Sequence, residues 1–273
     1  MTGAIRAPAV AGRFYPAEVG ELDALLADCL RDLPREGRRC RAAIVPHAGL
    51  VYSGRTAAAV FARLAIPPVV VILAPNHTGQ LASPGASLWD HGSFLTPLGP
   101  VAVESAFAGR LVAECELARP DALAHREEHA VEVELPSLQR LAPAASIVPI
   151  VLGWDDWVRC RTLAHALARV VASWPVDVLL LASSDMTHYE SAAEAARKDR
   201  LALAAVEQLN GAGLLETCRR HDISMCGRAA AATVLEAARE LGASGAELVD
   251  YRHSGLVSGD DTSVVSYAGV LIP

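Results

Sequence analysis

The chain alternates short, continuous apolar runs with longer segments whose apolar residues recur at helical spacing. Four runs, at 42–47, 67–77, 146–153 and 176–185, are strand-length and have a continuous apolar centre. This pattern is typical of strands buried on both faces of a parallel sheet. Apolar residues at helical spacing predict helices, which fall at 55–64, 104–116, 129–141, 155–173, 191–210, 212–219 and 226–241.

The remaining segments complete an α/β pattern. Two further strands are predicted at 246–253 and 263–272, and the Gly- and Pro-broken stretch 87–103 indicates a hairpin or short strands over a loop. No internal repeat or interdomain linker is visible. We therefore expect one domain over residues 1–273, an α/β fold with a largely parallel central sheet and helices on both faces.

Composition narrows the class of protein. The chain is 52% apolar and 20% charged with a net charge of −7, which is typical of a globular protein and argues against a general nucleic-acid binder. No apolar run reaches the ~18 residues of a membrane span, and the N-terminus lacks a secretory signal pattern. Six cysteines occur without a CxxC pair, as expected for reduced thiols. These features predict a cytoplasmic protein that does not bind membranes or nucleic acid.

Histidines follow three of the four predicted core strands. His47 ends the first strand, His77 ends the second, and Asp185 and His188 follow the fourth. Ligands of open α/β sheets bind outside the carboxyl ends of the strands. Each histidine alone is typical of a structural residue, but three at equivalent strand ends favour a metal or catalytic site. Asp185 and His188 are expected to form an oriented proton-transfer pair.

Cys226 is a further candidate, since it lies where a helix is predicted to begin. Helix N-termini stabilise a thiolate, the form that binds metal. The alternative is a small buried residue at a helix start, and the residue pattern leaves both interpretations open.

The segment around His129 matches a zinc-peptidase pattern. His125, Glu128 and His129 form H-x-x-E-H, which requires both histidines on one continuous helix. The helix is predicted to begin near Glu127 or Glu128, which leaves His125 in a loop. The match is therefore interpreted as a coincidence, and His129 is expected to face the crevice as an acid-base group.

Seven blocks in this sequence resemble those of the Memo family, whose bacterial and archaeal members are called AmmeMemoRadiSam system protein B. They span nearly the whole chain: RAPAVAGRFYP (6–16), VPHAGLVYSG (45–54), LAPNHTG (73–79), EEHAVEVELPSLQ (127–139), SSDMTHY (183–189), SMCGR (224–228) and GDDTSVVSYAG (259–269).

The resemblance implies a fold similar to that of class III extradiol dioxygenases, which hold non-haem Fe(II) through two histidines and a carboxylate. It places His47 and His77 as metal ligands and Cys226 in place of the carboxylate. It also places His188 and His129 as active-site histidines. The implied metal is Fe(II), with zinc or copper as alternatives because a thiolate is a softer ligand.

Two classes of function remain open at this point. One is a metal-dependent redox enzyme, dioxygenase-like, acting on a small molecule or peptide. The other is a non-catalytic scaffold that binds metal or phosphopeptides through a vestigial pocket. The resemblance also implies radical-SAM and AMMECR-like proteins as pathway partners.

Overall fold

The computed structural model describes residues 4–82 and 84–273. Its strands are β1 (Ile5–Arg6), β2 (Ala42–Val45), β3 (Val69–Pro75), β4 (Ala86–Leu88), β5 (Ser93–Thr96), β6 (Gly99–Ala102), β7 (Ala118–Pro120), β8 (Ser146–Leu152), β9 (Val178–Ser183), β10 (His188–Glu190), β11 (Glu247–His253) and β12 (Val264–Ile272).

The helices are α1 (Val19–Cys29), α2 (Leu50–Arg63), α3 (Ser105–Glu114), α4 (Leu123–Arg126), the 3₁₀ turn η1 (Glu132–Glu134), α5 (Leu135–Leu141), α6 (Trp157–Ser173), α7 (Ala192–Glu207), α8 (Gly211–Arg220), α9 (Arg228–Glu240) and α10 (Gly255–Ser258). Within the described ranges, none of these helices combines the length and the apolar character needed to cross a membrane.

The four predicted core strands form the centre of a nine-stranded sheet. They lie side by side in the order β2-β9-β3-β8, and each adjacent pair is parallel. Antiparallel strands extend this centre on both sides, since β12 pairs with β2 and β4 pairs with β8. The sheet is therefore mixed: its parallel part is the part that the continuous apolar runs predicted.

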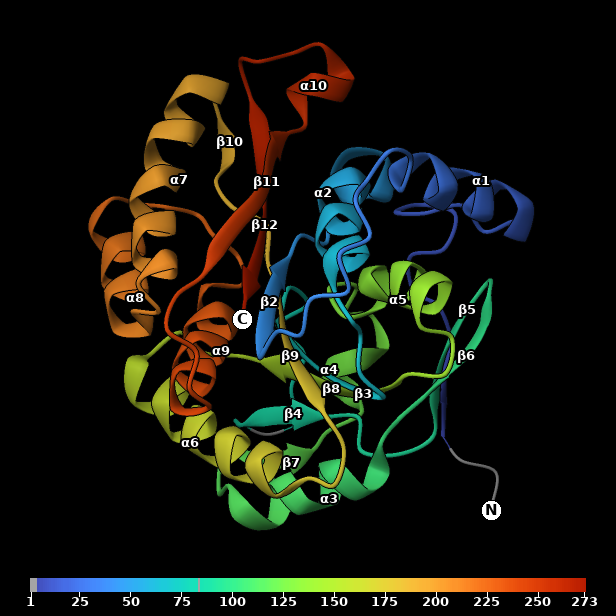
Figure 1. The fold of residues 1–273 in the computed structure, drawn as a ribbon, viewed down its shortest axis with the longest axis vertical. Coiled ribbons are helices and arrows are strands. Elements are labelled where there is room, and N and C mark those ends of the chain that lie inside the picture. Colours follow the sequence, from blue (N-terminus) through green and yellow to red (C-terminus); the bar gives the residue numbers. More distant parts are fainter. Residues whose placement is uncertain (1–3, 83) are drawn as a thin grey trace.

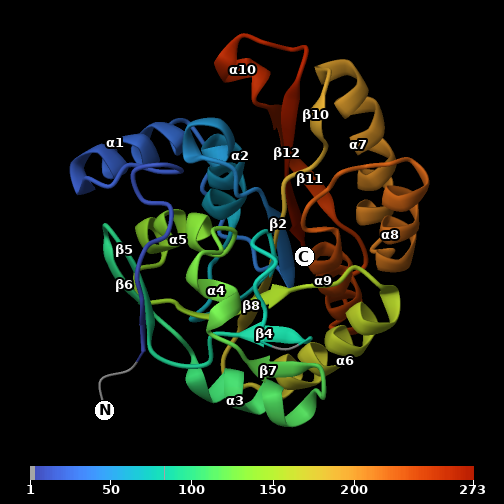
Figure 2. The same ribbon diagram turned by 180° about the vertical axis from the view of Figure 1, so that it is seen from behind.

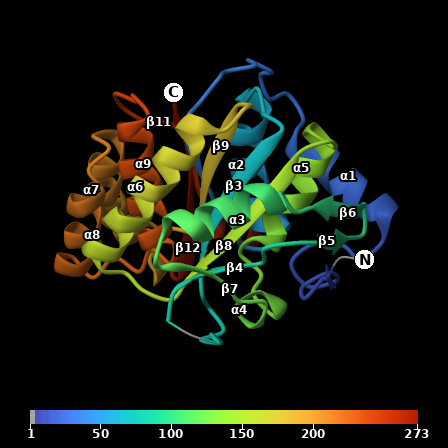
Figure 3. The same cartoon turned by 90° about the horizontal axis from the view of Figure 1, so that it is seen from below.

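Helices cover both faces of the sheet, as the apolar runs require. Along β3, Val69, Val71 and Leu73 pack in one apolar cluster with α6 and α9. The alternating residues Val70 and Ile72 pack in a second cluster with α2 and α5. Figure 1 shows α7, α8 and α9 on one side of the sheet and α1, α2 and α5 on the other. Seen from below, α6 lies beside α9 (Figure 3). The predicted α/β class is confirmed.

Two local predictions need correction, and one holds. The stretch 87–103 does form short strands, with β5 and β6 as a hairpin that pairs with β1 near the N-terminus (Figure 2). The helix predicted over 129–141 begins later, as η1 at Glu132 followed by α5. Pro136 explains the delay, because proline is tolerated only in the first turn of a helix. His125 lies in α4 and not in a loop.

A buried ion pair ties the N-terminal segment to the middle of the chain. Arg6 and Glu132 are 1% and 0% exposed at their side chains and form a salt bridge. Glu132 also accepts hydrogen bonds from the amides of Ala9 and Val10 and from the Tyr15 hydroxyl. The guanidinium of Arg6 donates to the carbonyl oxygens of His125 and Glu128. The segment that carries His129 is thereby fixed against the N-terminus.

Candidate metal centre

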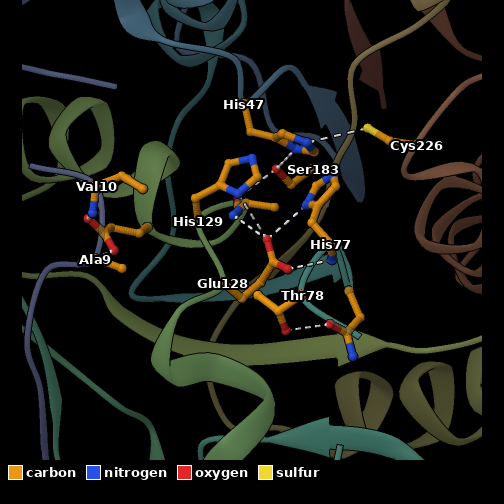
Figure 4. Close-up of polar contacts among 12 residues, drawn as sticks. Ala9, Val10, His47, His77, Thr78, Glu128, His129, Ser183 and Cys226 are labelled. Atoms are coloured by element: carbon orange, nitrogen blue, oxygen red, sulfur yellow. Dashed lines mark hydrogen bonds and ion pairs between the residues drawn. The ribbon is translucent and has the colours of Figure 1, made fainter. Parts of the chain in front are cut away.

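The carboxyl ends of three neighbouring strands converge on one crevice. His47 follows β2 by two residues, His77 follows β3 by two, and Asp185 follows β9 by two. Cys226 comes from the loop before α9 and completes the group. His47, His77 and Cys226 each offer a donor atom within 4.8 Å of the others (Figure 4). The structure thus brings together the three residues predicted as metal ligands.

The His47 imidazole is held at one nitrogen and faces the crevice with the other. Its Nδ1 lies 2.7 Å from the Ser183 hydroxyl, and its Nε2 lies 3.3 Å from the Cys226 sulfur. Burial lowers the pKa of His47 and the neighbouring His77 acts in the same direction, so that the pKa is about 3. The ring is therefore neutral at neutral pH, which is the form that ligates metals.

Glu128 orients the second histidine. Its carboxylate accepts hydrogen bonds from the His77 backbone amide at 2.6 Å and from His77 Nδ1 at 2.9 Å (Figure 4). Burial would raise the pKa of Glu128, but hydrogen bonding and charge from His77 hold it at about 2. A carboxylate on the outer nitrogen of a metal-ligating histidine is a recurring arrangement that fixes the ring and its tautomer. Sequence reasoning missed this role of Glu128.

Cys226 differs from its expected state. Its sulfur accepts a hydrogen bond from the Asp185 amide at 3.2 Å, yet burial raises the pKa of Cys226 well above that of an ordinary thiol, and the charge of Asp185 raises it further. For the metal-free protein burial therefore favours the neutral thiol, and of the two interpretations that the residue pattern left open it supports a small buried residue at a helix start. The residue lies two positions before α9, and desolvation outweighs the helix. A bound cation would reverse this balance.

His129 lines the same crevice. Its ring stacks on His77 with a centroid distance of 4.5 Å and meets the edge of His47 at 5.4 Å. Phe14 covers it at a centroid distance of 4.6 Å. Burial lowers the pKa of His129 and the nearby His47 acts in the same direction, so that the pKa is about 4. The predicted position at the crevice is correct, although His129 precedes η1 and does not begin a helix.

Asp185 and His188 flank Cys226, with donor atoms of the three within 4.8 Å of one another. No direct hydrogen bond joins Asp185 to His188 in the described part of the chain. Asp185 Oδ1 instead accepts from the backbone amides of His47 and Ala48, at 2.9 and 3.2 Å. Burial raises the pKa of Asp185, while the charge of His188 opposes the rise. The expected oriented pair is thus replaced by a carboxyl that holds the His47 turn.

The zinc-peptidase pattern does not form. His125 is buried in α4, where its Nε2 donates to the Ser87 carbonyl at 2.9 Å and its ring packs near Trp89 and Phe94. The helix ends at Arg126, so His125 and His129 do not share one helix face. This geometry agrees with the interpretation of the motif as a coincidence. Its glutamate, Glu128, nevertheless contributes to the site, because it accepts hydrogen bonds from His77.

The donor set fits a metal ion. With metal–nitrogen bonds of about 2.1 Å and metal–sulfur bonds of about 2.3 Å, a histidine nitrogen and a thiolate on one ion lie about 3.1 Å apart at a right angle and about 3.6 Å apart in a tetrahedron. The 3.3 Å between His47 Nε2 and Cys226 Sγ falls between these values. A cavity of about 270 Å³ adjoins Cys226, with Trp154 and Arg228 among its lining residues.

Comparison with known proteins gives consistent matches over the whole chain. A family model described as Memo-like protein matches residues 6–271. A MEMO1 family protein of Methanopyrus kandleri is 39% identical, over 97% of this chain and 98% of its own length. A MEMO1 family protein of Aquifex aeolicus is also 39% identical, over 98% of both chains. An uncharacterized protein of Escherichia coli K12, known from a crystal structure, aligns over 84% of this chain and 99% of its own with a TM-score of 0.49 and 14% identity.

Proposed function

This chain belongs to the Memo-like family, and on that premise we propose that it binds one metal ion through His47, His77 and Cys226. The observation that carries the proposal is the way the two imidazoles are held. Ser183 engages Nδ1 of His47 and Glu128 engages Nδ1 of His77, so each ring keeps Nε2 for a ligand. Partners that fix ring orientation in this way are a general feature of metal-ligating histidines.

Fe(II) is the proposed metal, with zinc or copper as alternatives. Two imidazoles and one thiolate suit all three ions, and three protein ligands leave coordination positions open. The open positions and the ionisable groups around them support a redox role on a small molecule or peptide. When bound, iron would supply one-electron chemistry at the crevice.

The surrounding side chains have definable tasks in such a reaction. His129 is neutral at neutral pH, so it can accept a proton from a ligand in the crevice. His188 keeps a buried Nδ1 without a partner among the described residues, and this nitrogen is available to a ligand. The Phe14 ring packs on His129 and excludes water from that side.

Anaerobic titration with Fe(II) tests the proposal. We expect wild-type protein to bind about one ion per chain, and His47→Ala to remove this binding with the circular dichroism spectrum unchanged. His221→Ala is the matched control, because His221 is exposed at the end of α8 and lies outside the candidate ligand groups of the described residues. Equal binding by wild type and His47→Ala would contradict the proposal.

Metal affinity is also expected to rise with pH. In the metal-free protein Cys226 is a thiol, because its pKa is raised, whereas His47 and His129, with pKa values of about 3 and 4, are already neutral. Above about pH 7.5, where an ordinary imidazole is also neutral, binding displaces one proton, from Cys226, and affinity should increase about tenfold per pH unit up to about pH 8.5. Dissociation constants measured at three pH values check this, and a flat profile would exclude Cys226 as the proton source.

A further inference from the structure

The Ser183 hydroxyl is a buried junction with three partners. Its oxygen lies 2.7 Å from His47 Nδ1, 2.7 Å from the Ala130 carbonyl oxygen and 2.7 Å from Glu134 Oε1. A serine hydroxyl donates one hydrogen bond and accepts two. Three contacts of this length use its whole capacity, so the donor and acceptor roles can be assigned by counting protons.

Only one assignment of donors and acceptors makes all three contacts of the Ser183 hydroxyl hydrogen bonds. The Ala130 carbonyl can only accept, so it receives the single Ser183 proton. His47 Nδ1 and Glu134 Oε1 must then both donate to Ser183. If Glu134 were ionised, two acceptors would face one proton, and an oxygen–oxygen contact of 2.7 Å would be left without a hydrogen.

We propose that Glu134 is a neutral carboxylic acid that donates to Ser183 and thereby holds His47 in the tautomer whose Nε2 lone pair faces Cys226. Glu134 is in this account a positioning residue for the metal centre, and its effect on metal affinity rests on the proposed function. The protonation state itself does not depend on a metal.

The surroundings of Glu134 support the neutral form. Its side chain is almost fully buried, and its Oε2 has no hydrogen-bond partner among the described residues. Burial raises the pKa of Glu134 well above its usual value, and the charge of Asp185 acts in the same direction. A bare carboxylate oxygen in such a place is strongly disfavoured, because nothing replaces the hydration that it loses on burial.

Two neighbouring buried glutamates differ from Glu134 in having positively charged or ionisable partners. Glu132 forms a salt bridge with Arg6, and Glu128 lies against the rings of His77 and His129. Glu134 takes part in no ion pair within residues 4–82 and 84–273. Three acids on one short segment thus meet different surroundings, and only Glu134 must serve as a donor.

Two measurements on the metal-free protein test the protonation state. The infrared difference spectrum between wild type and Glu134→Gln at neutral pH is expected to show the carbonyl band of a protonated carboxylic acid. The matched control, Glu132→Gln, is expected to remove a carboxylate band pair. Nitrogen chemical shifts of the wild-type His47 ring should report a proton on Nδ1. A carboxylate signal for Glu134, or a proton on Nε2 alone, would overturn the proposal.

Metal titration of two variants tests the positioning role. Glu134→Gln keeps a neutral donor of the same shape and should retain Fe(II) affinity to within about threefold. Glu134→Met removes the donor and should weaken binding by about 10–100-fold, the usual range for partners of metal-ligating histidines. Equal affinities for both variants would overturn the positioning role. Failure of wild-type protein to bind metal would instead overturn the proposed function and leave the spectroscopic result standing.

Discussion

Cys226→Ala is expected to weaken Fe(II) binding by at least about 100-fold. Structural zinc sites with four protein ligands bind with about 10–16 kcal/mol, so one ligand contributes about 2.5–4 kcal/mol. In this protein the remaining protein ligands would be the two imidazoles of His47 and His77. The loss should be visible in an anaerobic competition titration with a chromogenic chelator.

Cys40→Ala is the control for this variant. Cys40 is half-buried and precedes β2, at the end of the sheet opposite to the crevice. Its removal should leave the dissociation constant unchanged. An affinity of Cys226→Ala for Fe(II) within about threefold of wild type would show that the sulfur is not a ligand, even if His47 and His77 bind the metal.

Arg6→Met is expected to lower the free energy of unfolding by about 3–5 kcal/mol, because it leaves the buried Glu132 carboxylate without its counter-charge. The substitution also removes the donors to the carbonyl oxygens of His125 and Glu128, at 2.7 and 2.6 Å. Metal affinity should fall as well, since the backbone that positions Glu128 and His129 loses its anchor. Urea unfolding followed by circular dichroism measures the first effect.

An exposed ion pair provides the comparison for Arg6. Arg219 pairs with Glu216 on the surface of α8, where solvent screens the pair, so Arg219→Met should leave stability nearly unchanged. In the double variant Arg6→Met/Glu132→Gln, part of the lost stability should return, because the unpaired buried charge is gone. A loss below about 1 kcal/mol in Arg6→Met would contradict the role assigned to the pair.

The core strands were the most predictable part of the fold. A strand such as β3 is buried on both faces, so it must be apolar at every position, and this leaves an unambiguous run in the sequence. Helix ends were less predictable: α1 was not anticipated, and η1 and α5 begin later than their apolar spacing suggested. Their boundaries depend on tertiary contacts and on Pro136.

His47 and His77 could be predicted because they end core strands, and the family resemblance added Cys226, whereas the partners of these ligands depend on three-dimensional contacts. Parallel neighbouring strands bring His47 and His77 to one edge of the sheet. Nothing in the sequence spacing shows that Glu128 would accept from His77, across 51 positions. The same holds for Ser183, which lies 136 positions from His47.

The ionisation state of Cys226 is a second property that the local sequence could not predict. A helix start predicts a lowered pKa, but the degree of burial decides the sign, and burial is set by packing from other parts of the chain. The adjacent sequence left a buried thiol and a thiolate both open and could not decide between them. A metal ion at the site is therefore what would make the sulfur a thiolate.

X-ray absorption at the iron edge of protein loaded anaerobically with one equivalent of Fe(II) tests the central claim most directly. The account predicts one sulfur neighbour at about 2.3 Å together with nitrogen neighbours at about 2.0–2.2 Å, with the sulfur shell absent in Cys226→Ala. A spectrum with only nitrogen and oxygen neighbours in wild-type protein would contradict a centre built from His47, His77 and Cys226.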